Sequence, residues 1–346
     1  MNDAPNDAPN DACSGRMLTL DRIEATRAAV APWIVETPVL EWSGVAKDAL
    51  LGAGTRAILK LELLQRTGSF KARGALANIL ALDAAQRAAG VTAVSAGNHA
   101  IAVAYAARAL GSDAKVVMHK AANPFRVAQC RELGAEVVLA DDIHAAFDEM
   151  ARIRDEEGRA VIHPFEGPDT ISGTATLGLE FARQAPDLDA VVVPVGGGGL
   201  IAGVATGFRL AGSTATIYGV EPDGACGMRD SLARGAPLDS VAVSTIADSL
   251  GAPLHLPYSF GVVRQLVEEI VTVSDDALQD AMLTTFSRLK LAVEPAGAAA
   301  LAALAGPLRE RLRGKAVGLI VCGANIDPAG FAGHLAAAQA RLDAAA

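Results

Sequence analysis

The stretch AVVVPVGGGGLIAGVATGF, residues 190 to 208, decides the fold class. Its start, Val191 to Val193, is β-branched and apolar, which is typical of a strand buried in a parallel sheet. Its end, Leu200 to Phe208, is compatible with a helix, so the tetraglycine run is expected at a strand-to-helix turn. Backbone N–H groups and the positive end of a helix dipole converge at such a turn, which favours phosphate binding. A flexible glycine linker, the alternative, seldom follows a buried strand directly.

Outward from this stretch, short apolar runs alternate with alanine-rich segments, which indicates strand-helix-strand units. The fold class we predict is α/β, with two doubly wound, mostly parallel sheets. Strands are expected at 57–61, 92–95, 115–118, 136–139, 191–195, 216–220, 270–273 and 316–321. Helices are expected at 70–82, 100–110, 124–133, 142–157, 173–184, 275–290 and 296–305. The loops that follow residues 95, 195 and 321 are then expected to face one cleft.

Length and composition set further limits. A chain of 346 residues with 51% hydrophobic and 20% charged residues is expected to form two coupled globular domains. We expect a large domain from 17–90 and 166–346, a small inserted domain at 91–165, and a disordered tail at 1–16. The net charge of -9 argues against a nucleic-acid partner. The uncharged run 190–208 is better explained by a buried strand and helix than by a membrane span.

The four cysteines, at 13, 130, 226 and 322, are far apart and lack metal-binding spacing. Neither a zinc site nor a disulfide framework is therefore expected. A reducing cytoplasm is the compartment that fits this pattern.

One lysine stands out in LELLQRTGSFKARGALANIL, residues 61 to 80. Lys71 is expected at the start of a helix, after a Gly-Ser turn and beside Phe70. An ammonium is unfavourable near a helix amino end and other positive charge, which lowers the lysine pKa and frees the amine for Schiff-base formation. The alternative is a solvated surface lysine.

A second motif is VTAVSAGNHAIAVAYAARAL, residues 91 to 110. Ser95, Asn98 and the amides of the turn offer donors at a helix start, suited to a carboxylate and a phenolic oxygen. The alternative is that Ser95 or Asn98 is an ordinary helix cap and that His99 is a satisfied polar residue.

Four motifs in this order resemble the fold-type II pyridoxal-phosphate enzymes of the serine/threonine dehydratase family, which includes serine racemase-like proteins. They are GSFKARGA around Lys71, SAGNHA at 95–100, GGGGL at 196–200 and CGANI at 322–326. A fifth, partial match is STIADS at 244–249.

The resemblance implies a role for each matched residue. Lys71 is the catalytic residue and binds the pyridoxal phosphate aldehyde covalently, and Phe70 lies against the ring. Asn98 hydrogen-bonds the ring's 3′-oxygen, and Cys322 faces the ring nitrogen. Two sets complete the site: Gly196, Gly197, Gly198, Gly199 and Leu200 hold the phosphate, and Ser95, Ala96, Gly97, Asn98 and His99 form the turn that binds the substrate carboxylate.

Two departures from the family pattern bear on function. Racemases that resemble this chain carry a second serine where Ala96 stands, so one-sided proton transfer, and with it elimination, is expected. Metal-activated relatives bind a divalent ion through three ligands. Here Glu221 and Ala225 remain, but Gly227 replaces an aspartate, so no metal is expected.

Glu294 matches a family glutamate near the active site, with no role assigned by the sequence. It is equally interpreted as a carboxylate at a helix start, just before Pro295. His255, Tyr258 and Phe260 are expected in a loop that either reaches the substrate's β-substituent or packs on the core.

The function implied is β-elimination of a small β-hydroxy amino acid, with L-threonine or L-serine as first choice, to a 2-oxo acid and ammonia. The alternatives are a dehydratase for phenylserine or 3-hydroxyaspartate, a serine racemase-like enzyme, and a non-catalytic module that binds a phosphate ligand. The partner expected is the small-molecule amino acid, and a homodimer is expected from the resemblance.

Overall fold

The computed structural model describes residues 18–345, so the tail predicted at 1–16 lies outside the described residues. The strands are β1 (Val39–Trp42), β2 (Arg56–Lys60), β3 (Val91–Val94), β4 (Ala114–His119), β5 (Glu136–Ala140), β6 (Ala160–Val161), β7 (Ala190–Pro194), β8 (Thr216–Pro222), β9 (Glu269–Val273) and β10 (Ala316–Ile320). All eight strands expected from the sequence are present, and the sequence missed β1 and β6.

The helices begin and end near the expected residues where a helix was expected. They are α1 (Leu20–Val30), α2 (Val45–Leu51), α3 (Lys71–Ala81), α4 (Ala84–Ala89), α5 (Asn98–Ala109), α6 (Pro124–Glu132), α7 (Ile143–Glu157), α8 (Pro168–Gln184), α9 (Gly199–Leu210), α10 (Gly227–Arg234), α11 (Pro257–Leu266), α12 (Asp275–Leu289), α13 (Pro295–Ala305) and α14 (Pro328–Ala345). The sequence missed α1, α2, α4, α10, α11 and α14.

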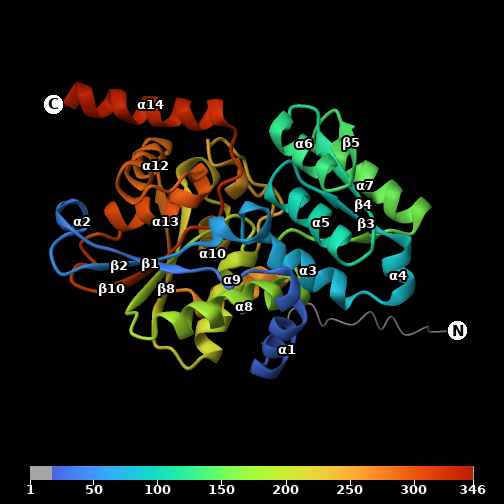
Figure 1. Cartoon of the computed structure of the whole chain (residues 1–346), viewed down its shortest axis with the longest axis horizontal. Coiled ribbons are helices and arrows are strands. Elements are labelled where there is room, and N and C mark those ends of the chain that lie inside the picture. Colours follow the sequence, from blue (N-terminus) through green and yellow to red (C-terminus); the bar gives the residue numbers. More distant parts are fainter. Residues whose placement is uncertain (1–17, 346) are drawn as a thin grey trace, which may run out of the picture.

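Two separate sheets organise the chain (Figure 1). The larger has the order β1-β2-β10-β7-β8-β9, and all its pairs are parallel except the antiparallel pair of β1 and β2. The smaller has the order β5-β4-β3-β6 and is entirely parallel. The predicted α/β fold class is thereby confirmed.

Side-chain alternation along the strands explains how helices cover both faces of the small sheet. Ala93 and Val116 point into a core shared with α5 and α3, whereas the next residues, Val94 and Val117, pack with Ile153 of α7. The core on the first face includes residues of α3, so this helix packs against both sheets' layers. The domain boundaries proposed from the sequence stay a prediction.

In the large sheet, α13 contacts strands β7 to β10, and α12 packs on its outer side. Helices α8 and α9 lie below the strands in Figure 1, and α3 packs against α8. This arrangement places the start of α3 beside the carboxyl ends of β7 and β10. Among residues 18–345, no helix is both long and apolar enough to span a bilayer.

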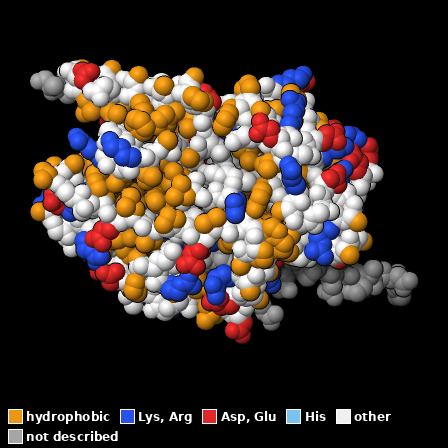
Figure 2. Space-filling model, in the orientation of Figure 1, with side chains coloured by type: hydrophobic (Ala, Val, Ile, Leu, Met, Phe, Trp, Pro, Cys, Tyr) orange, Lys and Arg blue, Asp and Glu red, His pale blue; other side chains and the backbone are white. Residues whose placement is uncertain are grey.

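Charged side chains of both signs are interspersed on the face drawn in Figure 2. Lys and Arg side chains alternate there with Asp and Glu, and they form no continuous basic strip on this face. Apolar side chains gather on the left of that view, over the large sheet's side of the molecule.

Close packing of α8 on α9 gives the first testable prediction. A β-carbon at Gly178 would lie 2.5 Å from the Val204 carbonyl oxygen, so Gly178→Ala is expected to lower the free energy of unfolding by about 1–3 kcal/mol. Gly261 of α11 is the matched control, because no atom lies within 4 Å of its β-carbon position. Urea unfolding of both variants tests this, and equal midpoints would contradict the packing described.

Candidate active site

The loop before α3 is fixed to the loop after β10. The Phe70 N–H donates to the Cys322 carbonyl at 3.1 Å, and the Ala324 N–H donates to the Gly68 carbonyl at 2.9 Å. Ser69 and Gly323 form an isolated antiparallel bridge between these bonds. Lys71 is the next residue after this short ladder and the first of α3, so two distant segments fix where its backbone stands.

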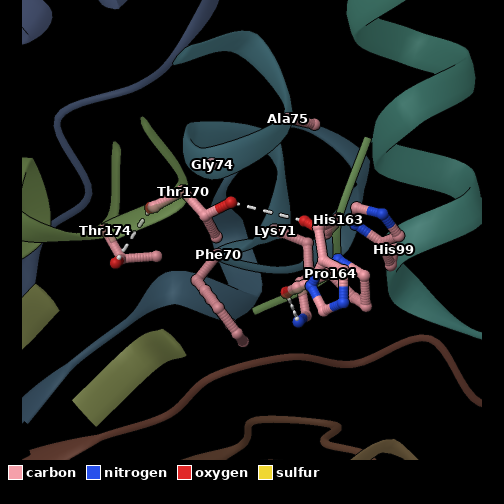
Figure 3. Close-up of a pocket in the computed structure, with 9 residues that line it drawn as sticks. All are labelled: Phe70, Lys71, Gly74, Ala75, His99, His163, Pro164, Thr170 and Thr174. Carbon is pink, nitrogen blue, oxygen red and sulfur yellow. Dashed lines mark hydrogen bonds between the residues drawn. The ribbon is translucent and has the colours of Figure 1, made fainter. Parts of the chain in front are cut away.

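Burial decides the chemistry of Lys71. Its Nζ donates to the Pro164 carbonyl at 2.6 Å and lies 5.0 Å from the centre of the Phe70 ring (Figure 3). Desolvation lowers the Lys71 pKa to about 8, although the nearby Cys322 and Glu294 oppose this shift. The sequence predicted this direction from a helix amino end and positive neighbours, but burial is the main cause.

A pocket beside Lys71 is lined by side chains without a fixed charge, apart from Lys71 itself (Figure 3). Burial lowers the pKa of His99 to about 3 and that of His163 to about 4, so both imidazoles are neutral near pH 7. The lining residues are Phe70, Lys71, Gly74, Ala75, His99, His163, Pro164, Thr170 and Thr174.

The tetraglycine run is a turn between β7 and α9, as the sequence predicted. Within residues 18–345, the backbone N–H groups of Gly196 to Leu200 donate to no protein acceptor. Gly198 has φ +95°, a conformation that favours glycine. These inward donors at a helix amino end, in a half-buried to buried loop, fit a phosphate group.

Phe165 covers the same turn and explains why side chains are excluded from it. A β-carbon at Gly197 would stand 2.1 Å from the Phe165 ring, and one at Gly199 would stand 2.7 Å from Phe165 Cα. Phe165 follows Pro164, whose carbonyl accepts from Lys71. One dipeptide therefore connects the lysine to the candidate phosphate site.

The turn from Ser95 to His99 follows β3 and starts α5. The Ser95 hydroxyl accepts from the Gly97 N–H at 3.1 Å, which leaves its own O–H free to donate within the half-buried turn. Ala96 is also half-buried. The His99 ring is buried, with Nε2 2.8 Å from the Ile162 carbonyl. His99 is thus the satisfied polar residue that the sequence analysis gave as an alternative.

Asn98 and Cys322 lie at the centre of the cleft. Asn98 is 5% exposed, and its Nδ2 donates to Glu294 at 2.6 Å. Burial, together with the charge of Glu294, raises the pKa of the Cys322 thiol well above its usual value. Cys322 is therefore a neutral thiol that cannot supply a charge to a ring nitrogen.

Several residues of this cleft escaped the sequence analysis. Asn325 Nδ2 donates to Asn98 Oδ1 at 2.7 Å, and Arg126 pairs with Asp248. The Nδ1 of His163 accepts from the Glu166 N–H at 3.0 Å and so holds the turn that presents Pro164. Asn325 and Asp248 stand in the CGANI and STIADS motifs, which were the available signal, whereas Arg126 had none.

The two remaining metal-ligand candidates have other surroundings. The Glu221 carboxylate accepts from the N–H groups of Met228 and Arg229, at 2.8 and 2.9 Å, and so caps α10. Ala225 is buried in a 3₁₀ turn just before that helix. No group of metal-ligating side chains is found in the described part of the chain.

The segment from His255 to Phe260 is not the loop that the sequence analysis expected. Tyr258 and Phe260 belong to α11, whose first N–H groups are capped by Glu166, which accepts from Tyr258 N at 2.6 Å. Phe260 is 4% exposed and packs in the large core. The core alternative of the sequence analysis is therefore the one that holds for Phe260.

Comparison with known proteins agrees with this geometry. The model of the family described as "Pyridoxal-phosphate dependent enzyme" matches residues 30–323. Phenylserine dehydratase of Ralstonia pickettii is 53% identical over 316 residues, 91% of this chain and 96% of that protein. L-threonine ammonia-lyase of Thermotoga maritima is 36% identical over 312 residues, 90% of this chain and 76% of that protein.

Among solved structures, maize serine racemase has a TM-score of 0.84 and 35% identity, and it covers 92% of this chain and 99% of its own. The threonine deaminase of T.th. has a TM-score of 0.82 and 40% identity, with 90% and 99% covered. The chain belongs to the pyridoxal-phosphate dependent enzyme family, and its cofactor is pyridoxal phosphate. It is a pyridoxal-phosphate-dependent dehydratase, the enzyme class that the sequence predicted.

The lowered pKa of Lys71 gives the second prediction. In the protein without cofactor, acetylation of Lys71 is expected to reach half of its maximal rate near pH 8, because the neutral amine is the nucleophile. Lys115 is the internal control, since hydrogen bonding to Glu157 raises its pKa above the usual 10.5. Peptide mass spectrometry across pH measures both rates. Parallel profiles for the two lysines would show that Lys71 is not desolvated.

Proposed function

We propose that this enzyme eliminates water from phenylserine or a closely similar β-hydroxy amino acid, giving a 2-oxo acid and ammonia. The observation that carries this proposal is the 53% identity to phenylserine dehydratase over nearly the whole length of both chains. The relatives named for threonine or serine reach 36–40% identity. The first choice of the sequence analysis, threonine or serine, is therefore the second candidate.

The residues that would hold pyridoxal phosphate are those the resemblance implied. Lys71 supplies the amine for covalent attachment, and the free N–H groups of Gly196 to Leu200 supply donors for the phosphate. Phe70, Asn98 and Cys322 surround the space for the ring. When bound, the cofactor supplies an electron sink for the electron pair left as the substrate's α-proton departs.

The amine of Lys71 is suited to move that proton. With a pKa of about 8, a substantial fraction is neutral near pH 7 to 8 and accepts the proton from Cα. Loss of the β-hydroxyl, protonated to water, then balances the removal of the α-proton. The enamine that remains takes up one water and yields the 2-oxo acid and ammonia.

The turn from Ser95 to His99 is proposed to bind the substrate carboxylate through the Ser95 hydroxyl and the amides of Gly97 to His99. These donors lie at the amino end of α5, where the helix dipole favours an anion. Burial of the neighbouring imidazoles keeps them neutral, so they add no second cation.

The pocket beside Lys71 favours a neutral β-substituent. Apart from Lys71, its lining is apolar, hydroxyl-bearing or neutral imidazole, and it offers no cation for the β-carboxylate of 3-hydroxyaspartate. An unpaired carboxylate buried there would lose its hydration without compensation. A racemase role is disfavoured by Ala96, which places no proton donor at that position of the turn. The homodimer and the cytoplasmic location stay predictions.

Substrate turnover gives the third prediction. The value of kcat/KM for phenylserine is expected to exceed that for threonine by about tenfold or more, because an apolar pocket discriminates by the surface it buries. Turnover of 3-hydroxyaspartate is expected to be the lowest of the three. A coupled assay of 2-oxo acid and ammonia measures all substrates in each configuration.

Two results would overturn the proposal. Failure to release ammonia from any of these amino acids would reject the elimination. Formation of the opposite serine enantiomer at a rate rivalling pyruvate, followed by chiral chromatography, would instead favour the racemase alternative.

A further inference from the structure

Glu294 is buried in the cleft, and its side chain does not serve its own helix. It is the residue before α13, yet its carboxylate makes no capping hydrogen bond to that helix. Only 1% of the residue is exposed. The carboxylate is turned towards Asn98 instead, and Oε1 stands 2.7 Å from where a β-carbon of Gly323 would be. Position 323 therefore has room for Glu294 only because it is glycine.

The amide of Asn98 is fixed from both ends. Its Nδ2 donates to Glu294 Oε1 at 2.6 Å, with Ser249 Oγ at 3.4 Å, and its Oδ1 accepts from Asn325 Nδ2 at 2.7 Å. A carboxylate without a proton can only accept, so Glu294 dictates which end of the Asn98 amide carries the N–H groups. Asn325 is fixed in turn, because its Nδ2 also donates to the Thr67 carbonyl at 2.7 Å.

Charges around Glu294 hold it in place. Its Oε2 has no hydrogen-bond partner within the described residues and lies 3.7 Å from an Arg126 nitrogen. Arg126 also pairs with Asp248 and donates to the Asn325 carbonyl at 3.0 Å. Burial raises the pKa of Glu294 to about 7, and Arg126 acts in the opposite direction. The guanidinium thus favours the ionised, acceptor-only form.

We propose that Glu294 is a positioning residue that sets the orientation of the Asn98 amide, so that an N–H group of Asn98 is available to the cofactor's ring oxygen. This inference rests on the cofactor-binding role proposed above for Asn98. Glu294 acts through Asn98 and does not itself exchange a proton with the substrate.

Glu294→Gln tests the proposal, because the new amide keeps the shape and can donate to Asn98, which removes the constraint on its orientation. The dissociation constant of pyridoxal phosphate, titrated by absorbance without substrate, is expected to rise about tenfold, as for one lost charge-assisted hydrogen bond. Asn98→Ala is expected to give a rise of similar size. The double variant is expected to bind no more weakly than Asn98→Ala alone.

The controls separate this role from a merely structural one. Glu310→Gln changes an exposed glutamate with the same chemistry and is expected to leave cofactor affinity unchanged. Circular dichroism establishes that each variant is folded, and Glu294→Asp, which keeps the carboxylate, is expected to recover part of the affinity. Wild-type affinity in Glu294→Gln, or losses that simply add in the double variant, would overturn the inference. Neither result depends on which amino acid the enzyme consumes.

Discussion

The buried ion cluster around Arg73 is the interaction on which the site's geometry depends. The Arg73 guanidinium is fully buried, donates to both carboxylate oxygens of Glu62 at 2.8 and 2.9 Å, and donates to Glu180 at 3.0 Å. Lys60 of β2 also pairs with Glu180. Burying these charges is expensive, so their benefit lies in specifying one arrangement, because any shift would leave a charge unpaired.

This cluster matters to the chemistry because Arg73 follows Lys71 by two residues. It ties the first turn of α3 to α8 through Glu180 and to the segment after β2 through Glu62. The backbone ladder to residues 322–324 fixes the other side of the same turn. Lys71 is thus held rigidly in a desolvated place, which is what lowers its pKa. Asn98 and Arg126 then bring the small sheet's loops to the same point.

The sequence predicted the parts of the site that lie in contiguous motifs. Lys71, the Ser95–His99 turn and the tetraglycine turn each follow a strand or precede a helix, so local pattern suffices to place them. The parallel sheets were predicted for the same reason. The edge strand β1 was missed because its four residues pair antiparallel at the margin of the sheet and show no buried apolar run.

Partners distant in sequence could not be predicted. Glu294 meets Asn98 across 196 positions and Arg126 meets Asp248 across 122, and neither pairing leaves a periodic trace in the chain. The sequence left Glu294 without a role because a glutamate before a proline equally suits a helix start. The depressed pKa of Lys71 was predicted in direction, but its cause, burial, emerges only once Phe70 and Pro164 surround the amine.

The central claim is that one buried amine, that of Lys71, carries the cofactor. Borohydride reduction of the protein loaded with pyridoxal phosphate, followed by proteolysis and peptide mapping, tests it most directly. The account predicts that the reduced cofactor is found on the peptide containing Lys71 and on no other lysine in stoichiometric amount. Labelling of a different lysine, or no labelling of Lys71, would contradict it.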